Sequence, residues 1–194
     1  MGGRLCLDFC NTSRDRIGLP EDRLRAYADV VGWAWRAGVL NAEEAGRLAR
    51  LGTRNPTEAL LVHERALRLR KSLRATFTTL AADRRIRPTM LEVLNEELAG
   101  AMARSQVVPT DDGFTWLWAQ GGKALDSMLW PIARSAADLL TDGPLASIRI
   151  CEGRACGWLF LDTSRNRTRR WCDMKICGNR AKARRHQERA RLTA

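Results

Sequence analysis

The segment 151–177, CEGRACGWLFLDTSRNRTRRWCDMKIC, contains four of the six cysteines in this chain of 194 residues. They form two pairs, Cys151 with Cys156 and Cys172 with Cys177. Four residues lie within each pair and fifteen lie between the pairs. Zinc prefers four tetrahedral ligands, and thiolates suit it well. Two cysteines on one tight turn can bind the same ion, and the intervening segment is long enough to fold back. The spacing therefore predicts one Zn²⁺ with these four cysteines as its ligands.

The alternatives are two disulfides or four thiols without a metal. Residues 1–8, MGGRLCLD, show neither the apolar region nor the cleavage site of a signal peptide. No apolar run approaches the roughly 20 residues that a membrane-spanning helix needs. We therefore expect a cytoplasmic protein with no membrane partner, associated with the bacterial nucleoid if it regulates genes. Thiols stay reduced in the cytoplasm, which favours metal ligands or buried thiols.

The residues around the cysteines predict a treble-clef zinc finger. Residues 157–161 are expected to form a strand, 163–167 a turn and 169–172 a returning strand, while Gly153 lets the first turn between cysteines be tight. A run of good helix formers covers 181–191, so Cys177 should lie at the start of a helix, where the helix dipole favours a thiolate. Four sulfur ligands leave no position for a catalytic water, so the zinc is predicted to be structural.

The charge of the chain is concentrated in the same region. Lysine and arginine number 33 against 22 acidic residues, a formal net charge of +11. Residues 146–194 hold 13 basic and 4 acidic residues, whereas residues 1–145 hold 20 and 18. The turn-forming segment TDGP at 141–144 separates the two parts. We predict a nearly neutral domain over 1–145 and a basic zinc finger over 146–194, and the excess indicates a polyanionic partner.

Duplex DNA is the partner that these basic residues favour. Arginine predominates, and its planar fork suits phosphates and the O6 and N7 atoms of guanine. The candidate DNA contacts are Arg165, Arg167, Arg169, Arg170, Lys175, Asn179, Arg180, Lys182, Arg184 and Arg185. RNA remains a possible partner, since a basic finger can also bind its phosphates, and Asn179 can equally cap the helix. A basic face that is only solvated is the remaining alternative.

The first 145 residues predict a mostly helical domain with a small antiparallel sheet, which makes the whole chain an α+β protein, mostly α. Asn41 and Glu44 fit a capping box, and Pro56 suits the first turn of a long helix. The expected elements are a strand over 4–10, helices over 22–37, 41–52, 56–82 and 88–102, a hairpin of 106–109 with 114–118 around an Asp-Gly turn, and a helix over 122–140.

Catalytic signals are weak in this domain. No acid, base and nucleophile are seen to converge, so we expect a protein that is not an enzyme. A pocket with Asp8, Asn11 and Arg14 could bind a small-molecule effector. His63 is expected to be solvated, and Cys6 and Cys10 are expected to be buried thiols. The Trp33/Trp35 and Trp116/Trp118 pairs are expected in the core or an interface, and Gly121-Gly122 is only a weak phosphate-loop signal.

Three motifs resemble known families. WLFLDTSRNRTRRWC at 158–172 followed by CGNRAKARR at 177–185 resembles the CGNR zinc-finger family. LDFCNT at 7–12 resembles the LDFVNT segment that opens its companion domain, ABATE, with Cys10 where the family usually has valine. The resemblance implies stress-induced transcription regulators, with a treble-clef DNA-binding module behind a domain that binds a small ligand.

Three hypotheses follow. The first is a DNA-binding transcription regulator whose N-terminal domain senses a ligand or forms a homodimer. The second is an enzyme with its active site in the N-terminal domain, although no converging acid, base and nucleophile are seen there. The third is a zinc-stabilised adaptor that binds RNA or an acidic protein.

Overall fold

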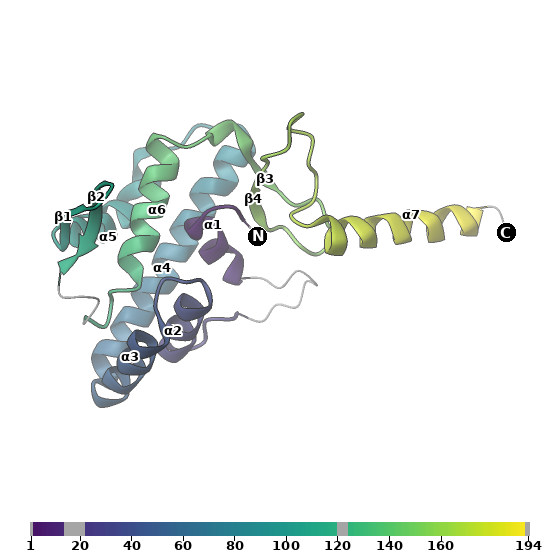
Figure 1. Ribbon diagram of the computed structural model, residues 1–194. Coiled ribbons are helices and arrows are strands. Elements are labelled where there is room, and N and C mark those ends of the chain that lie inside the picture. Colours follow the sequence, from purple (N-terminus) through teal and green to yellow (C-terminus); the bar gives the residue numbers. More distant parts are fainter. Residues whose placement is uncertain (1, 14–21, 120–123, 193–194) are drawn as a thin grey trace.

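The computed structural model describes residues 2–13, 22–119 and 124–192. They form a helical body with two small antiparallel sheets, and the C-terminal helix extends away from this body (Figure 1). The helices are α1 (Leu5–Cys10), α2 (Tyr27–Arg36), α3 (Ala42–Arg54), α4 (Pro56–Ala81), α5 (Glu92–Met102), α6 (Leu129–Thr141) and α7 (Asn179–Leu192). The strands are β1 (Ser105–Thr110), β2 (Gly113–Trp118), β3 (Ile148–Ile150) and β4 (Leu159–Leu161). The predicted class, α+β and mostly α, is confirmed.

Helices α3 and α4 begin where the sequence predicts. The backbone N–H of Glu44 donates to Asn41 Oδ1 at 2.9 Å, and the N–H of Asn41 donates to Glu44 Oε2 at 2.8 Å. This capping box satisfies N–H groups that have no partner within the helix. Pro56 is the first residue of α4, where its missing N–H costs nothing. Helix α4 then passes through the core, with Leu69, Leu73 and other apolar residues buried.

Two element predictions in the first 40 residues are wrong. Leu5–Cys10 form helix α1 where a strand was expected over 4–10; Cys6 and Cys10, both fully buried, are among its core residues. A short apolar segment that is buried on most sides has no regular spacing of polar residues, so its sequence does not distinguish a helix from a strand. Helix α2 begins at Tyr27, not Asp22, because the Asp22 carboxylate is hydrogen-bonded to the Leu24 N–H and ion-paired with Arg70.

His63 also differs from its prediction. It is buried, with 8% of its surface exposed, and its Nε2 lies 2.9 Å from the carbonyl oxygen of Leu24. The arginines next to it in sequence suggested a solvated helix face. On a helix, however, neighbours in sequence point in different directions, and His63 faces the core with Ala59 and Ala66, four residues before and three after it.

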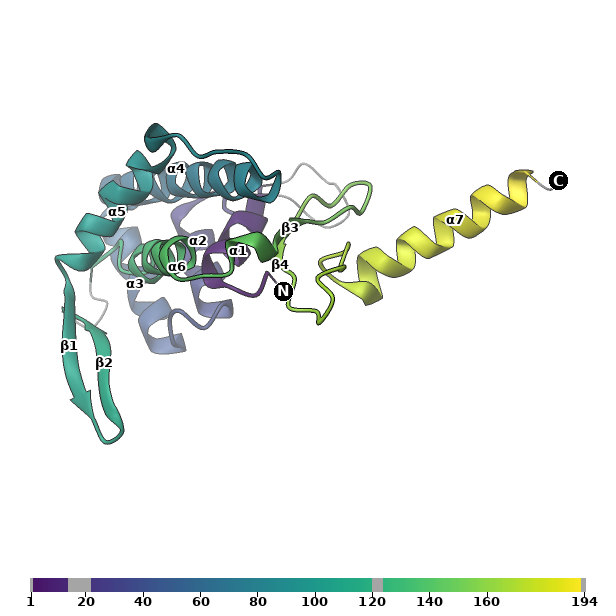
Figure 2. The same ribbon diagram turned by 90° about the horizontal axis from the view of Figure 1, so that it is seen from above.

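The β1–β2 hairpin projects from the end of the body opposite α7 (Figure 2). Thr110 is paired with Gly113, so Asp111 and Asp112 form a two-residue turn. Gly113 has a φ of 138°, which side-chain-bearing residues rarely adopt. Trp118 returns to the body, where its ring lies 5.9 Å from that of Trp130. The predicted start of the last helix, at 122, lies outside the described residues, and α6 begins at Leu129.

The second sheet corrects the predicted hairpin of the finger. Strand β4 pairs with β3, which precedes it, and not with residues 169–172. The first cysteine pair therefore lies in the loop between β3 and β4. Leu159 and Leu161 of β4 belong to the main core, whereas Trp158 and Phe160 pack with the four cysteines. Because successive side chains of a strand point to opposite faces, β4 joins the two cores.

Hydrogen bonds also join the finger to α1 and its flanking residues. The buried amide of Asn11 donates from Nδ2 to the Leu159 carbonyl and accepts from the Leu159 N–H, both at 2.8 Å. The Leu161 N–H donates to the carbonyl of Gly2 at 2.8 Å. Asn11 thus replaces a neighbouring strand at the edge of β4, and the finger is attached to the body through backbone groups.

We expect Asn11→Ala to destabilise the protein by about 2–4 kcal/mol, because a buried N–H and a buried carbonyl of Leu159 would both lose their partner. Urea unfolding followed by circular dichroism measures the change. Asn95→Ala is the matched control, since Asn95 is exposed on α5 and should cost less than about 1 kcal/mol. Equal unfolding midpoints for the two variants would contradict the role given to Asn11.

Candidate metal centre and nucleic-acid interface

The four predicted zinc ligands are brought together in the structure. All four are buried, and their Sγ atoms lie within 4.8 Å of one another. The Sγ atoms of Cys156 and Cys172 are 3.7 Å apart, and those of Cys172 and Cys177 are 3.8 Å apart. A regular tetrahedron with Zn–S bonds of about 2.3 Å has sulfurs about 3.8 Å apart. The cluster therefore has the dimensions of a tetrahedral zinc site, and one structural Zn²⁺ is its cofactor.

Hydrogen bonds within the cluster oppose the ionisation of all four thiols together when no metal is bound. Hydrogen bonds from Cys156 and Cys172 lower the pKa of Cys151 to about 2. The hydrogen bond to Cys151 raises the pKa of Cys156 to about 12, and hydrogen bonds to Cys151 and Cys156 raise the pKa of Cys172. Without metal, the crowded thiols thus favour a single shared negative charge. Zn²⁺ offsets half of the charge of four thiolates and makes their simultaneous ionisation possible.

Local backbone features position each cysteine pair. In the first loop, a Cβ atom on Gly153 would lie 3.3 Å from Cys177 Sγ, so the absence of a side chain lets the loop approach the second pair. Gly157, directly after Cys156, has a left-handed backbone with a φ of 59°. In the second pair, Asp173 Oδ1 accepts hydrogen bonds from the N–H groups of Lys175 and Ile176.

These bonds make Asp173 the cap of the π-helical turn Met174–Gly178, which contains Cys177 and continues directly into α7. Cys177 therefore lies at a helix start, as predicted. Asn179 has helical dihedral angles and is not the cap, so its exposed amide is available for other contacts.

The loop after β4 is organised by the buried Asp162. Its carboxylate accepts hydrogen bonds from the backbone N–H groups of Ser164 and Arg169, both at 2.9 Å. Burial opposes its ionisation, but the Ser164 hydroxyl and these two N–H groups donate to the carboxylate and lower its pKa. The carboxylate therefore stays charged at neutral pH and fixes both ends of the loop, which leaves Arg165 and Arg167 exposed between them.

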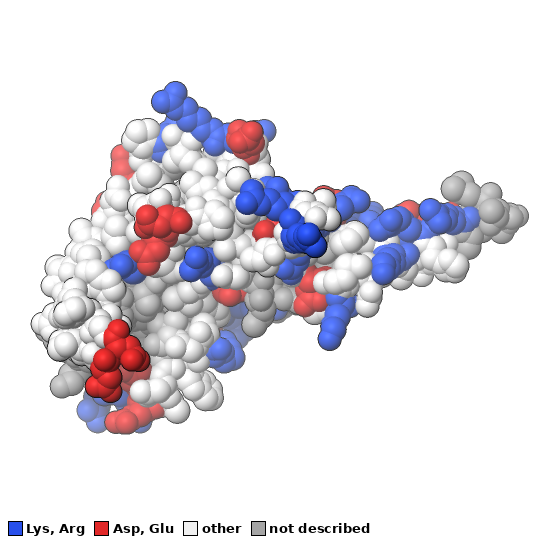
Figure 3. Space-filling model, turned by 45° about the horizontal axis from the view of Figure 1, so that its top comes forward, with Lys and Arg blue, Asp and Glu red and all other residues white. Residues whose placement is uncertain are grey.

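The predicted DNA contacts occupy two different kinds of position. On and next to α7, the exposed side chains are Lys175, Asn179, Arg180, Lys182 and Arg185, while Arg184 is half-buried and lies 3.5 Å from Glu188. Arg169 instead has an internal role: it donates to the carbonyls of Trp171 and Cys172, and lies over the Phe160 ring. Arg170 is exposed and paired with Glu152. Figure 3 shows the Lys and Arg side chains along the projecting helix.

Two of the three predicted effector residues line one cavity. Asp8 and Asn11 belong to the wall of a cavity of about 570 Å³, next to the finger residue Trp158. Arg14 lies outside the described residues. No local sequence pattern indicated three arginines and one tryptophan of this wall, because they come from segments far apart in the chain. These are Arg4, Arg23, Trp33 and Arg36.

A family comparison matches both parts of the chain. Residues 3–143 match the model of the ABATE family, described as "Putative stress-induced transcription regulator". The chain belongs to the ABATE family. Residues 147–190 match the CGNR zinc finger, which contains all four cysteines of the cluster. A comparison with curated proteins finds no match. Among the described helices of this ABATE protein, none is both long and apolar enough to cross a membrane.

Cys172→Ser tests the zinc assignment. We expect the wild-type ABATE protein to contain about one Zn²⁺ per chain and the variant to lose most of it, because serine is a poor zinc ligand. Loss of the ion should also unfold the finger, since binding and folding are coupled in such modules. Elemental analysis and circular dichroism measure the two effects. Cys6→Ala, which removes a buried thiol outside the cluster, should keep its zinc. Full zinc content in Cys172→Ser would refute the four-ligand site.

Proposed function

We propose that this protein is a zinc-dependent transcription regulator that binds duplex DNA through its finger. The observation that carries the proposal is α7, a projecting helix of 14 residues with basic side chains around most of its circumference. Of the α7 side chains described, only Ala181 is buried. A helix this polar adds little to the protein core, so its composition needs another explanation.

The dimensions and charge of α7 suit the DNA major groove. Fourteen residues span about 21 Å, and the groove is about 12 Å wide, enough to admit an α-helix. Basic side chains on opposite sides of such a helix can reach the phosphates of both strands. The helix contains one acidic residue, Glu188, which is close to Arg184. The zinc cluster fixes the start of α7 and so would fix its direction relative to the body.

Residues 169–172 of the finger extend the same basic surface. The guanidinium groups of Arg170 and Arg185 lie 5.5 and 6.0 Å from the ring centre of Trp171. Trp171 therefore brings an arginine of the loop beside an arginine of α7. We propose that most of these arginines contact phosphates and that a few, with Asn179, contact base edges.

RNA and an acidic protein are weaker candidates. The major groove of A-form RNA is too deep and narrow for side chains to reach base edges, so an inserted helix favours DNA. The described side chains of α7 include no aromatic residue on which unpaired bases could stack. We also propose that the protein is not an enzyme, since a closed sulfur shell offers the zinc no catalytic position. Its proposed location is the cytoplasm, at the nucleoid.

The double variant Lys182→Ala/Arg185→Ala tests DNA binding. We expect its affinity for duplex DNA to fall roughly tenfold or more, and its log–log salt slope to become shallower by about 1.8, because two phosphate contacts are lost. Fluorescence anisotropy between about 50 and 200 mM salt measures both.

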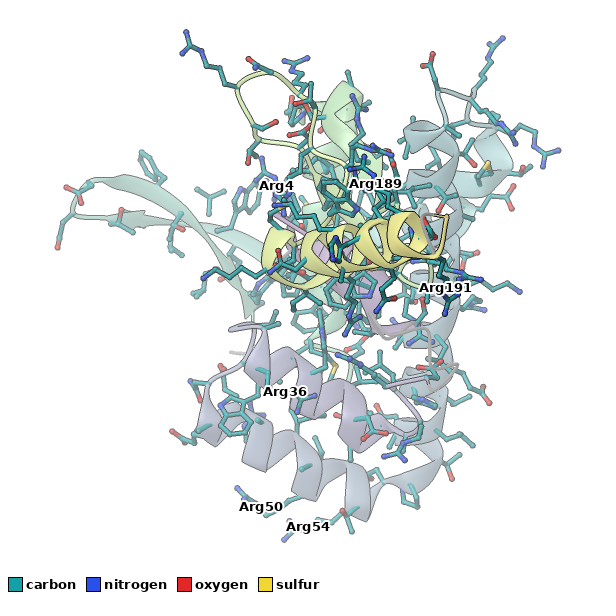
Figure 4. All side chains as sticks on the ribbon, turned by 90° about the vertical axis from the view of Figure 1, so that its right-hand side faces the viewer. Arg4, Arg36, Arg50, Arg54, Arg189 and Arg191 are labelled. Carbon is teal, nitrogen blue, oxygen red and sulfur yellow. The ribbon has the colours of Figure 1, made fainter. Side chains whose placement is uncertain are left out.

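The matched control is Arg50→Ala/Arg54→Ala, which removes the same charge from α3, away from α7 in Figure 4. Its affinity should change little. Equal losses in the two variants, or stronger competition by structured RNA than by duplex DNA, would contradict the proposal.

We further propose that the N-terminal domain binds a small effector and forms a homodimer through the β1–β2 hairpin. One face of the hairpin is apolar: Val107 is opposite Trp116, and Pro109 is opposite Phe114, which is 79% exposed. Exposed apolar patches mark interaction sites. Two fingers on one dimer would contact two half-sites, and so compensate for the few base pairs that one finger covers.

Phe114→Asp should convert the dimer to a monomer, because it places a charge on the apolar face next to the turn, and sedimentation velocity measures this change. Thr115→Asp is the matched control, since Thr115 is exposed on the opposite face and should leave the dimer intact. Zinc content and helicity should be unchanged in both variants. A wild-type monomer, or a dimer that only Thr115→Asp dissociates, would contradict this interface.

A further inference from the structure

The cavity that contains Asp8 and Asn11 lies where the finger meets the helical body. Its wall combines α1 and its N-cap Arg4, the start of the η1 turn (Asn11–Ser13), the end of α2 and Trp158 of the finger. Its volume of about 570 Å³ is within the range of small-molecule sites. The Asn11 amide is already bound to Leu159, so Asn11 forms part of the wall and ties the cavity to β4.

The charge of the cavity favours an anion. Its described wall contains three arginines, Arg4, Arg23 and Arg36, against one acidic residue, Asp8. Asp8 accepts a hydrogen bond from the Gly2 N–H at 2.8 Å, which offsets part of its charge. Within the described ranges, neither Arg4 nor Arg36 forms an ion pair with an acidic residue. Several arginines around one concave site attract an anion more strongly than each would alone.

Aromatic side chains give the cavity its apolar surface. Trp33 of α2 packs against Phe9 of α1, with ring centres 5.0 Å apart, and lines the cavity from the body. Trp158 lines it from the finger and is 6% exposed. Indole rings bind planar groups by stacked or edge-to-face contact, with a fixed geometry and a large buried area. The two tryptophans therefore favour a flat apolar group over a fully hydrated ion.

We propose that this cavity binds a small aromatic carboxylate, whose charge pairs with the arginines of the wall and whose ring packs against its tryptophans. Arginine suits this ligand because its planar fork pairs with a carboxylate through two parallel hydrogen bonds. The proposal names the chemical class of the effector and so rests on the effector part of the proposed function. Such a ligand contacts the body and the finger together. Through Trp158 it reaches the zinc cluster, since the Trp158 carbonyl accepts a hydrogen bond from the Cys151 N–H at 2.8 Å.

The test compares two probes of the same shape with the full zinc-loaded chain. By titration calorimetry, 1-naphthoate should bind at least about tenfold more tightly than the neutral 1-naphthamide, because only the acid can form charge-assisted hydrogen bonds. Arg4→Met and Arg36→Met, which remove charge but keep an apolar stem, should each weaken naphthoate about tenfold. Arg50→Met is the control, since the described wall of the cavity includes Arg4 and Arg36 but not Arg50.

Measuring DNA affinity in the same samples separates this inference from the proposed function. Naphthoate binding without DNA binding would support the ligand class and overturn the regulator. DNA binding with no naphthoate binding, or with equal binding of acid and amide, would overturn the ligand class alone. If Arg36→Met weakened DNA binding but not naphthoate binding, the arginines would belong to the DNA surface and the inference would fail.

Discussion

Strand β4 is the element on which the rest of the structure depends, because both of its faces are buried in different cores. Leu159 and Leu161 pack into the helical body, while Trp158 and Phe160 pack around the zinc ligands. The alternation of side chains along a strand makes this possible within four residues. The edge of β4 is closed by the Asn11 amide, which pairs with the backbone of Leu159. The finger is therefore anchored in the body and is not a module on a flexible linker.

This anchoring explains how the charge of the chain is used. The body is nearly neutral and the basic excess belongs to the last quarter of the sequence, on a loop and a helix that extend from the shared core. The zinc cluster holds the start of α7, so the helix needs no apolar face of its own. Its side chains are then available for a polyanion. The cavity beside Trp158 lies where the finger meets the helical body, so an effector bound there would contact both.

Local sequence signals predicted the elements whose causes are local. The capping box of Asn41 and Glu44 places the start of α3, and Pro56 places the start of α4. The cysteine spacing predicted the metal centre, because ligand type and tetrahedral geometry need few assumptions about the rest of the fold. The strand expected over 4–10 was wrong, since α1 is buried on most of its surface and that burial removes the periodic pattern. His63 was misplaced for a related reason, as its face of α4 is set by what packs against it.

The sequence by itself determined the zinc ligands, the mostly helical class and the location of the basic charge, since each follows from residue type and short-range spacing. Only the tertiary structure decided which strand pairs with β4, because that choice depends on burying two apolar faces at once. It also decided the roles of single residues. Arg169 was a candidate DNA contact until its guanidinium was found on the carbonyls of Trp171 and Cys172. Arg4 and Arg36 carried no signal until folding placed them on one cavity wall. Long-range contacts of this kind have no periodicity and no fixed spacing, so no local pattern encodes them.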